Sequence, residues 1–369
     1  MSEGRLTKFR VAGFRSIRDA TVELTPATIL IGPNGVGKSN LLWALEMVRM
    51  LAFESLQRFV SERGGAAYLL HYGPRNTIAL ELELEFNGQG GDNAYEATLA
   101  YTEDNNLFFL KERAGYRPLG AAEWTWCDLG AGHRESRLKE KSADDATART
   151  VRWRLRRINF YHFHDTSRRS ALRTPSYADT SADYLRSDGS NLPIYLMALM
   201  NAQDKGGQAA WRRIEGALRQ VAPFIRELKP VEDRTGVRLE WIDDRGETFG
   251  PAHLSDGTLR ALALISALAQ PQDSLPLLSS IDEPELGLHP AGLGVLCGLI
   301  SSVAARRQVI VSTQSPVVLD HFEPEQVIVV ERREAASHFQ RLDPAALAGW
   351  LEDYSLSELY DKNVLGGRP

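Results

Sequence analysis

The chain has 369 residues, of which 43% are hydrophobic, and its net charge is −5 with a pI near 6.0. A chain of this length and content can bury a sizeable core, in two domains or in one large domain with an insertion. Its charge excludes a globally basic nucleic-acid-binding protein, so any surface for nucleic acid would be a local patch.

The cysteines and the apolar pattern exclude further classes. Cys127 and Cys297 lie too far apart in the sequence for a disulfide framework or a zinc cluster, and they suit a reducing compartment. The first ten residues are polar and lack the apolar segment of a signal peptide, and no apolar run approaches the roughly 20 residues of a membrane helix. The sequence therefore predicts a cytoplasmic protein with no membrane partner.

The first half of the chain is predicted to contain a meander of strands with one helix near its start. Residues 28–31 form a short apolar run that leads directly into glycine, which is typical of a buried strand. Residues 77–86 alternate between polar and apolar side chains, as a half-buried strand does. The expected elements are two strands within 5–31, a helix over 40–59, strands over 77–86, 94–101 and 107–113, a mobile polar loop over 130–148, and a strand over 158–161.

The second half is predicted to begin with a helical lobe and to continue as alternating helices and strands. Two amphipathic stretches between residues 180 and 228 indicate the lobe, and residues 236–250 are typical of a hairpin. The alternation that follows indicates a mostly parallel sheet covered by helices. The expected elements are helix 255–270, strand 275–281, helix 290–306, strand 307–312, helix 316–320 and strand 326–331, followed by a hairpin arm and two small helices.

A glycine-rich loop joins the first predicted buried strand to the first predicted helix. Gly32–Ser39 match the pattern G-x-x-x-x-G-K-[ST], in which backbone N–H groups and a helix N-terminus bind phosphate oxygens. Lys38 is expected to reach the β- and γ-phosphates, and Ser39 to ligate Mg²⁺. The alternative is a chance glycine-rich turn. The predicted contacts to ATP are Asn34, Gly35, Gly37, Lys38, Ser39 and Asn40.

Two adjacent carboxylates follow the apolar strand predicted at 275–281. An ATPase with such a phosphate loop needs one acid to hold the magnesium ion and often a second acid that activates the attacking water. Asp282 suits the first role and Glu283 the second. The alternative is an acidic helix start, because Pro284 and Glu285 come next.

The motif Leu254–Thr258 (LSDGT) precedes the helix predicted at 255–270. It resembles the LSGGQ signature of ABC-type ATPases, from which Asp256 and Thr258 depart. A serine cap, a glycine and a helix N-terminus again suit an anion. In ABC-type folds this element closes over the γ-phosphate bound by the partner subunit, so the resemblance implies that Ser255 and Gly257 act in a homodimer. The alternative is an ordinary helix cap.

With these motifs in order, the chain resembles the SMC-like branch of ABC ATPases, in particular the RecF- and OLD-like group, over most of 5–40 and 250–369. Residues 11–17 (VAGFRSI) look like that group's first strand, and 282–290 (DEPELGLHP) join the carboxylates to a D-loop. The resemblance implies an α/β P-loop NTPase, that is, an ABC-type head with a mixed or parallel sheet, an antiparallel β-subdomain and an inserted helical lobe. It also implies three parts: an N-terminal ATPase lobe at 1–177, the helical lobe at 178–230 and a C-terminal ATPase lobe at 231–369.

The same resemblance assigns two further residues. Gln314, in the segment 312–316 (STQSP), stands at the switch position, where most relatives have histidine. Glutamine can donate a hydrogen bond to a γ-phosphate but cannot become positively charged, which affects the expected rate of hydrolysis rather than ATP binding. Arg15 is implied as a γ-phosphate sensor, with a solvated surface arginine as the alternative.

The position of the Q-loop has no glutamine. Residues 162–167 (HFHDTS) stand there, and His164 or Asp165 are the candidates to contact the metal site in its place. An independent metal centre is the weaker alternative, because the spacing of binuclear zinc hydrolases is missing. A structural or hinge role for this segment is the other interpretation.

An arginine-rich stretch lies between the two ATPase motifs, and Asp165 is its only acid. It could bind a phosphate backbone, or it could be a solvated face that balances nearby acids. Arg152, Arg154 and Arg156 alternate as on one face of a strand, which predicts a DNA-binding patch. The arginines of this stretch are Arg149, Arg152, Arg154, Arg156, Arg157, Arg168, Arg169 and Arg173.

Three functions are therefore weighed. The favoured one is an ATPase that dimerises head-to-tail on ATP and acts as a switch on DNA, or on a DNA-acting partner, in DNA repair or phage defence. The second is a slow-turnover ATP-binding module that controls a protein effector. The third, a transporter ATPase subunit, is disfavoured by the long insertion and the missing Q-loop glutamine.

OLD-like relatives continue into a Toprim nuclease domain. Too few residues follow the predicted ATPase core to form a Toprim domain, so any nuclease is expected to be a separate chain.

Overall fold

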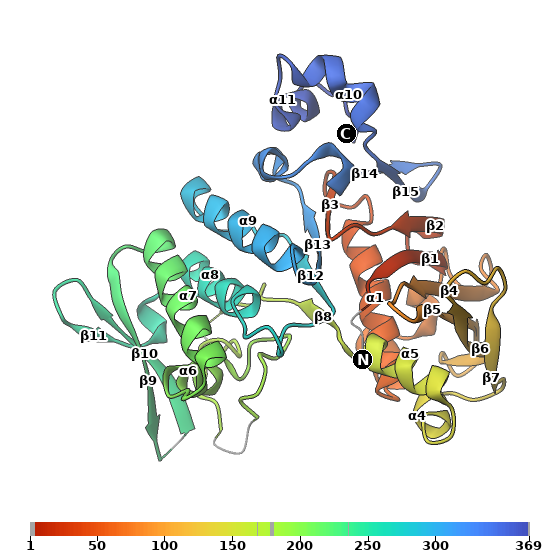
Figure 1. Cartoon of the computed structure of the whole chain (residues 1–369), viewed down its shortest axis with the longest axis horizontal. Helices are drawn as coiled ribbons and strands as arrows, with labels where there is room; N and C mark the ends of the chain where they lie inside the picture. The colour runs from red at the N-terminus through yellow and green to blue at the C-terminus, as the bar shows by residue number, and fades with distance from the viewer. Residues whose placement is uncertain (1–3, 168, 178–180, 235, 368–369) are drawn as a thin grey trace. The chain divides into compact units, whose positions relative to one another are not determined.

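The computed structural model describes residues 4–167, 169–177, 181–234 and 236–367 (Figure 1). The chain forms two compact units. Unit 1 comprises Met1–Phe160, Leu277–Ser280 and Gln308–Pro369, and unit 2 comprises Tyr161–Pro276 and Ile281–Arg307. This division groups the chain differently from the three functional lobes expected at 1–177, 178–230 and 231–369, which stay a prediction.

An antiparallel six-stranded sheet forms one layer of unit 1, in the order β2-β1-β4-β5-β6-β7. Helix α1 (Lys38–Ala52) lies beside this sheet (Figure 1), and apolar side chains of the sheet and of α1 belong to one core. The strict alternation in β4 gives this strand a buried face, because every second residue of β4 is buried. The strands are β1 (Leu6–Phe14), β2 (Ile17–Glu23), β4 (Ala79–Phe86), β5 (Gly91–Tyr101), β6 (Leu107–Pro118) and β7 (Thr125–Gly130).

A second six-stranded sheet has the order β15-β14-β3-β13-β12-β8. Strand β3 is fully buried and pairs in parallel with both β13 and β14, and Val311 lies opposite Ile29. The predicted mostly parallel sheet is therefore present, with the antiparallel hairpin β14–β15 at its edge. Its strands are β3 (Ala27–Ile31), β8 (Ile158–Tyr161), β12 (Leu278–Asp282), β13 (Gln308–Thr313), β14 (Val327–Arg333) and β15 (Ala336–Arg341).

The helix predicted over 40–59 is two helices, because α1 ends at Ala52 and α2 follows at Leu56–Glu62. The segment 130–148, which was expected to be a mobile loop, is also partly helical. It contains α4 (Leu138–Lys141) and the start of α5 (Ala146–Arg156), whose N-terminus is capped by the Asp145 side chain. The remaining helices of unit 1 are α3 (Ala66–Leu69), α10 (Pro344–Leu351) and α11 (Leu356–Asp361), with short 3-10 turns at Pro316–His321 and Pro324–Gln326.

The turn that precedes α4 is held by a buried glutamate. Glu112 of β6 is fully buried and accepts hydrogen bonds from the hydroxyls of Tyr95 and Ser136 and from the backbone N–H of Arg137. Nε2 of His133 lies 2.9 Å from the second oxygen of Glu112. A buried carboxylate needs several donors, and this requirement explains why a polar segment is ordered here.

Unit 2 contains helices that pack on one another and a small three-stranded sheet. Helix α7 (Lys205–Val221) packs against α6 (Leu192–Met200), α8 (Asp256–Leu268) and α9 (Pro290–Ala304) (Figure 1). The helical pattern expected up to residue 228 ends earlier. Pro223 follows α7, and residues from Ile225 onward form β9 (Ile225–Asp233), which pairs with β10 (Gly236–Asp243) and, through it, β11 (Thr248–Phe249). The hairpin predicted at 236–250 is confirmed.

No helix among the described residues is both long enough and apolar enough to cross a membrane.

Candidate functional site

The phosphate loop of unit 1 has the backbone that its glycines predict. Buried strand β3 ends at Ile31, and α1 begins at Lys38. Gly35 and Gly37 have φ angles of 81° and 106°, values that favour glycine over residues with a side chain. The N-terminus of a helix fifteen residues long therefore opens directly from the loop, an arrangement that suits an anion.

The ammonium of Lys38 lies inside this loop. Its Nζ donates to the carbonyl oxygens of Gly32, at 2.7 Å, and Pro33, at 2.9 Å, and the residue is 4% exposed. These bonds keep a positive charge at the start of α1, where it adds to the partial positive charge of the helix N-terminus. The loop is therefore electropositive at the position that the sequence motif predicts.

A chain of hydroxyls and one amide supports the back of the loop. The Ser337 hydroxyl donates to the carbonyl oxygen of Val36 at 2.6 Å and lies 2.6 Å from the Ser16 hydroxyl. The amide of Asn40 donates to the same Ser16 oxygen at 2.7 Å. A Cβ placed on Gly37 would lie 2.0 Å from Ser337 Oγ, so the glycine is also required by this close approach. Asn40 thus supports the loop, and sequence reasoning missed Ser337 altogether.

Arg15 lies beside Asn40 with its guanidinium over the Trp43 ring, 4.2 Å from the ring centre. Its Nη1 is 3.4 Å from the side-chain oxygen of Asn40. Burial, and to a lesser degree the positive charge of Arg63, lower the pKa of Arg15 from its ordinary value. The structure therefore places Arg15 next to the residue that supports the loop, while its predicted role as a sensor stays a prediction.

Gln314, the predicted switch residue, follows the end of β13. The turn after it is closed by a hydrogen bond from the backbone N–H of Ser315 to the Thr313 hydroxyl, at 3.0 Å. In the sheet, β13 lies between β3 and β12. The strand before Gln314 is therefore the direct neighbour of the strand that leads into the phosphate loop.

The signature motif lies in unit 2 and forms a capped helix N-terminus. The Ser255 hydroxyl accepts a hydrogen bond from the backbone N–H of Thr258 at 3.1 Å and lies 2.8 Å from the Thr258 hydroxyl. Gly257 packs directly on the D-loop, since an added Cβ would lie 1.9 Å from the carbonyl oxygen of Gly287. The helix cap weighed as the alternative is thus present, and it is compatible with the signature interpretation.

Arg260 connects the signature helix to two other segments of unit 2. Its guanidinium donates to the carbonyl oxygens of Phe163, His164 and Leu286, at 2.9, 3.0 and 2.8 Å. Burial lowers its pKa, while the charges of Asp256 and Glu283 oppose the shift. Sequence reasoning missed this residue, although a single arginine within the apolar run 259–269 was a signal.

Arg173 holds the opposite side of the same motif. Its Nε donates to the carbonyl oxygen of Thr166 at 2.8 Å, and its two terminal nitrogens donate to the carbonyl oxygens of Pro251 and Leu254. One of these nitrogens also donates to the carboxylate of Asp256 at 2.7 Å. The predicted signature is therefore positioned by two arginines, Arg173 and Arg260.

The two predicted catalytic carboxylates lie at the end of β12. Glu283 has a φ of 46°, a left-handed conformation that a residue with a side chain rarely adopts and that is often found at functional sites. Asp282 lies near His164, whose Nε2 is 4.0 Å from its Oδ2. Burial lowers the pKa of His164, and the charge of Asp282 opposes this effect.

Of the two Q-loop candidates, His164 thus lies near Asp282, whereas the described side-chain hydrogen bond of Asp165 is to Ser167. The Asp165 side chain is exposed and accepts a hydrogen bond from the backbone N–H of Ser167 at 2.9 Å, and hydrogen bonding to the Ser167 side chain, and then to its backbone, lowers the pKa of Asp165. Across the described part of the chain, no group of three or more His, Cys, Asp or Glu side chains is arranged to hold a metal ion.

The predicted arginine patch requires a correction. Residues 152–156 belong to helix α5 rather than to a strand, so the alternating arginines do not share one face. Arg154 is 3% exposed and donates to the carbonyl oxygen of Asn87 at 2.9 Å, which makes it part of the fold. Arg152 and Arg156 are one helical turn apart, and the Arg156 guanidinium stacks on Phe53 together with Arg49. Arg168 lies outside the described residues.

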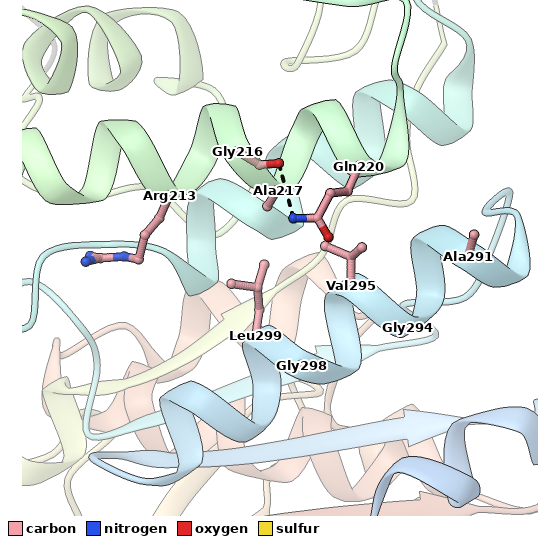
Figure 2. Close-up of a pocket in the computed structure, with 9 residues that line it drawn as sticks. All are labelled: Arg213, Gly216, Ala217, Gln220, Ala291, Gly294, Val295, Gly298 and Leu299. Atoms are coloured by element: carbon pink, nitrogen blue, oxygen red, sulfur yellow. Dashed lines mark hydrogen bonds between the residues drawn. The ribbon is translucent and has the colours of Figure 1, made fainter.

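Unit 2 also has an open pocket between α7 and α9 that contains no predicted ATP-site residue (Figure 2). On the α7 side of this pocket, the Gln220 side chain donates to the carbonyl oxygen of Gly216 one turn earlier, at 3.5 Å (Figure 2). The charged lining residue is Arg213, whose guanidinium donates to the carbonyl oxygens of Ala269 and Gln270. The lining is completed by small and aliphatic residues, namely Ala217, Ala291, Gly294, Val295, Gly298 and Leu299.

Comparison with known families and proteins places these motifs in context. Residues 27–320 match the family described as "AAA domain, putative AbiEii toxin, Type IV TA system". The DNA replication and repair protein RecF of Parasynechococcus marenigrum (strain WH8102) is 42% identical over 85 residues, which are 22% of this chain and 23% of that protein. The chromosome partition protein Smc of Thauera aminoaromatica is 43% identical over 61 residues, 14% of this chain and 5% of that protein. This chain therefore matches less than a quarter of either relative's length.

Two solved Smc head domains are similar in fold. One, bound to the C-terminal domain of ScpA and derived from Pyrococcus furiosus, has a TM-score of 0.61 at 13% identity and covers 95% of this chain and 99% of its own. The other, an Smc head bound to the C-winged helix domain of ScpA, has a TM-score of 0.59 at 16% identity and covers 93% of this chain and 99% of its own. At such identities the likeness concerns the fold alone, and it confirms the predicted α/β head with its mixed sheets.

Proposed function

This chain belongs to the AAA-domain family that matches residues 27–320, within the SMC- and RecF-like ABC-type ATPases, and we propose that it is an ATP-driven switch. In this proposal ATP is hydrolysed at sites that a second copy of the chain completes. The observation that carries the proposal is the phosphate loop, in which the buried Lys38 ammonium and the N-terminus of α1 provide positive charge at one place.

The nucleotide site is proposed to use the loop from Asn34 to Asn40. Backbone N–H groups at Gly35 and Gly37 bind phosphate oxygens, and Lys38 moves from the loop carbonyls to the β- and γ-phosphates. The support for this role is the position of the Lys38 ammonium inside the loop, where it donates to the carbonyl oxygens of Gly32 and Pro33, because charge-assisted bonds to phosphate are stronger than bonds to neutral carbonyls.

The residues proposed for Mg²⁺ have suitable chemistry. Ser39 offers a hydroxyl at the start of α1, and Asp282 offers a largely buried carboxylate at the end of β12. Hard oxygen ligands of this kind suit Mg²⁺, which keeps several waters in sites formed with a nucleotide. When bound, the ion would neutralise charge on the β- and γ-phosphates.

Hydrolysis is proposed to depend on Glu283 and Gln314. The Glu283 carboxylate accepts a proton from the water that attacks the γ-phosphorus, and ADP leaves. Gln314 donates a hydrogen bond to the γ-phosphate but brings no positive charge. The presence of glutamine at position 314, where most relatives have histidine, also supports a second candidate function. In that function the chain is a slow-turnover module that holds ATP and controls a protein effector.

The partner copy is proposed to contribute Ser255 and Gly257. Both stand at the N-terminus of α8, and Arg173 and Arg260 hold that helix end in place. A prepositioned helix N-terminus favours the γ-phosphate carried by the other copy. ATP would then join two heads, and hydrolysis would release them.

The proposed target is DNA, or a separate nuclease or effector chain that acts on DNA. The support is the described functions of two relatives, replication and repair for RecF and chromosome partition for Smc, together with the cationic cluster of Arg49, Arg152 and Arg156. A role in repair or in phage defence is part of the proposal, and the family description, which includes a toxin of a toxin–antitoxin system, is compatible with defence.

The Glu283→Gln variant tests the proposal. With the base removed, ATP should bind but turn over at least about 100-fold more slowly, and a dimer should accumulate that is detected by light scattering after gel filtration. Glu103→Gln, at an exposed position of unit 1, is the matched control and should behave as the wild type. Unimpaired turnover in Glu283→Gln would contradict the assigned base. ATPase rates with and without DNA then separate the DNA switch from the effector module.

A further inference from the structure

The guanidinium of Arg173 is fixed by the backbone of unit 2 before any partner arrives. Carbonyl oxygens of Thr166, Pro251 and Leu254 accept from its three nitrogens, and the side chain is 9% exposed. Each of these three acceptors is neutral. The positive charge of Arg173 is therefore held in place but not balanced by them, and the group that balances it is Asp256.

Asp256 stands at a position that is unfavourable for an anion partner. It lies between Ser255 and Gly257, the two residues proposed to meet a γ-phosphate, and its side chain is 72% exposed. A carboxylate at the first position of a helix favours the helix itself, because it complements the helix dipole. The same negative charge would repel an approaching phosphate, and the ABC-type signature that this motif resembles has glycine at that position.

Other charged groups near Asp256 do not remove this repulsion. The Arg260 guanidinium interacts electrostatically with Asp256, but it donates to three carbonyl oxygens on the side of the D-loop and residues 163–164. Arg173 Nη2 contacts the carboxylate directly, at 2.7 Å. The direct pair thus makes the local charge of the signature close to zero.

We propose that Arg173 is a positioning residue for the ATP-bound dimer, because it neutralises Asp256 and so permits the signature of one copy to approach the γ-phosphate held by another. The inference rests on the proposed dimer and adds to it a charge pair specific to the LSDGT form of the motif. The pair should have little influence on ATP binding by a single copy, since neither Arg173 nor Asp256 is among the residues proposed to bind the nucleotide within one copy.

A set of four proteins tests the pair, all in the Glu283→Gln background so that hydrolysis does not intervene. They are the parent, Arg173→Met, Arg173→Lys and the double variant Arg173→Met with Asp256→Asn. The dissociation constant of the ATP-bound dimer is measured by sedimentation at low and high salt. ATP affinity of each protein is measured at concentrations below dimer formation.

The charge model predicts a distinct pattern. Arg173→Met should weaken the dimer by about tenfold at each site, hence by roughly 100-fold for a symmetric dimer with two sites. Arg173→Lys should keep most of the affinity, and Asp256→Asn should restore the Arg173→Met protein. The defect of Arg173→Met should shrink at high salt, because exposed charges are screened.

A structural role of Arg173 would give a different pattern. If its hydrogen bonds to the three carbonyls alone mattered, Arg173→Lys and Arg173→Met would be equally defective and Asp256→Asn would not restore the Arg173→Met protein, which would overturn the inference. A dimer unchanged in Arg173→Met would overturn it as well. If the parent itself formed no dimer with ATP, the proposed dimer would be wrong, and the role of Arg173 would be rejected together with it.

Discussion

The hydroxyls of Ser16 and Ser337 lie 2.6 Å apart, although Ser16 follows the first strand of the chain and Ser337 belongs to β15. Ser337 also donates to the carbonyl oxygen of Val36 in the phosphate loop. The shape of the loop therefore depends on a residue far outside its sequence motif. Local sequence alone does not determine the affinity of such a loop for a nucleotide.

Replacing Ser337 with alanine should weaken ATP binding without unfolding the protein. The change removes one buried hydrogen bond to the loop, and a bond of this kind contributes about 0.5–1.5 kcal/mol, so the dissociation constant for a fluorescent ATP analogue should rise by about two- to tenfold. Ser301→Ala, at an exposed site on α9, is the control. An unchanged dissociation constant in Ser337→Ala would show that this support is dispensable.

Replacing Gly257 with alanine should abolish the proposed dimer and leave ATP binding by a single copy intact. The new Cβ would lie 1.9 Å from the carbonyl oxygen of Gly287, so the signature and the D-loop must separate. Gly216→Ala is the matched control, because its Cβ would meet nothing within 4 Å and alanine favours a helix. Light scattering with ATP measures both. Equal dimer formation by both variants would refute the predicted role of Gly257.

The arginines of α5 should separate into a binding pair and a structural residue. Reversing the charge of Arg152 and Arg156 should lower DNA affinity and reduce the salt dependence of log K by about one unit for each phosphate that is no longer neutralised. Arg154→Met should instead lower the free energy of unfolding by about 1–3 kcal/mol, because a buried side chain loses its hydrogen bond to Asn87. Fluorescence anisotropy and urea denaturation measure the two effects.

Arg212→Glu, at an exposed position on α7, controls for the change in net charge. If that variant lost as much DNA affinity as the Arg152 and Arg156 variant, the binding surface would be elsewhere. A stable Arg154→Met protein with weakened DNA binding would contradict the division of roles.

Alkaline pH should destabilise the protein through Tyr95. Burial, and then the negative charge of Glu112, raise the pKa of the Tyr95 hydroxyl well above its ordinary value of 10.0. Above that pH the unfolded chain loses a proton that the folded chain keeps. The stabilising contribution is therefore complete below pH 10 and declines at higher pH by about 1.4 kcal/mol per pH unit.

Tyr95→Phe should flatten this decline between pH 10 and pH 11, at the cost of a lower stability at neutral pH from the lost hydrogen bond to Glu112. Urea denaturation over the pH range is the measurement. Tyr177→Phe is the control, since that side chain is 72% exposed. The interpretation fails if both variants retain the full alkaline decline.

The sequence was sufficient wherever a function depends on neighbouring residues in the chain. The phosphate loop, the strand before it and the helix after it are formed by consecutive residues. Gly35 and Gly37 have positive φ angles, which favour glycine, so the sequence motif itself reports the backbone conformation. Leu254–Thr258 likewise predicted a capped helix N-terminus. Contacts such as those of Ser337 and Arg173 join distant segments, and no local pattern identifies them.

The wrong prediction at α5 had a specific cause. Arginines at every second position imitate the alternation of a strand, although the apolar residues Ala148, Val151 and Leu155 have helical spacing and are buried. Asp145 was also a suitable N-cap. The polar segment before α5 was expected to be mobile because the buried Glu112 that orders it lies in β6, 25 positions before its partner Arg137.

Unit 1 is assembled from three separate stretches of the chain, and β14 and β15 come from the last of them. During synthesis on the ribosome, the phosphate loop emerges long before β14 can pair with β3 and before Ser337 can reach Val36. A nascent chain that stops ahead of β14 would expose the edge of β3 and lack this support. Nucleotide binding should therefore be acquired late in translation, once β14 and β15 have been made.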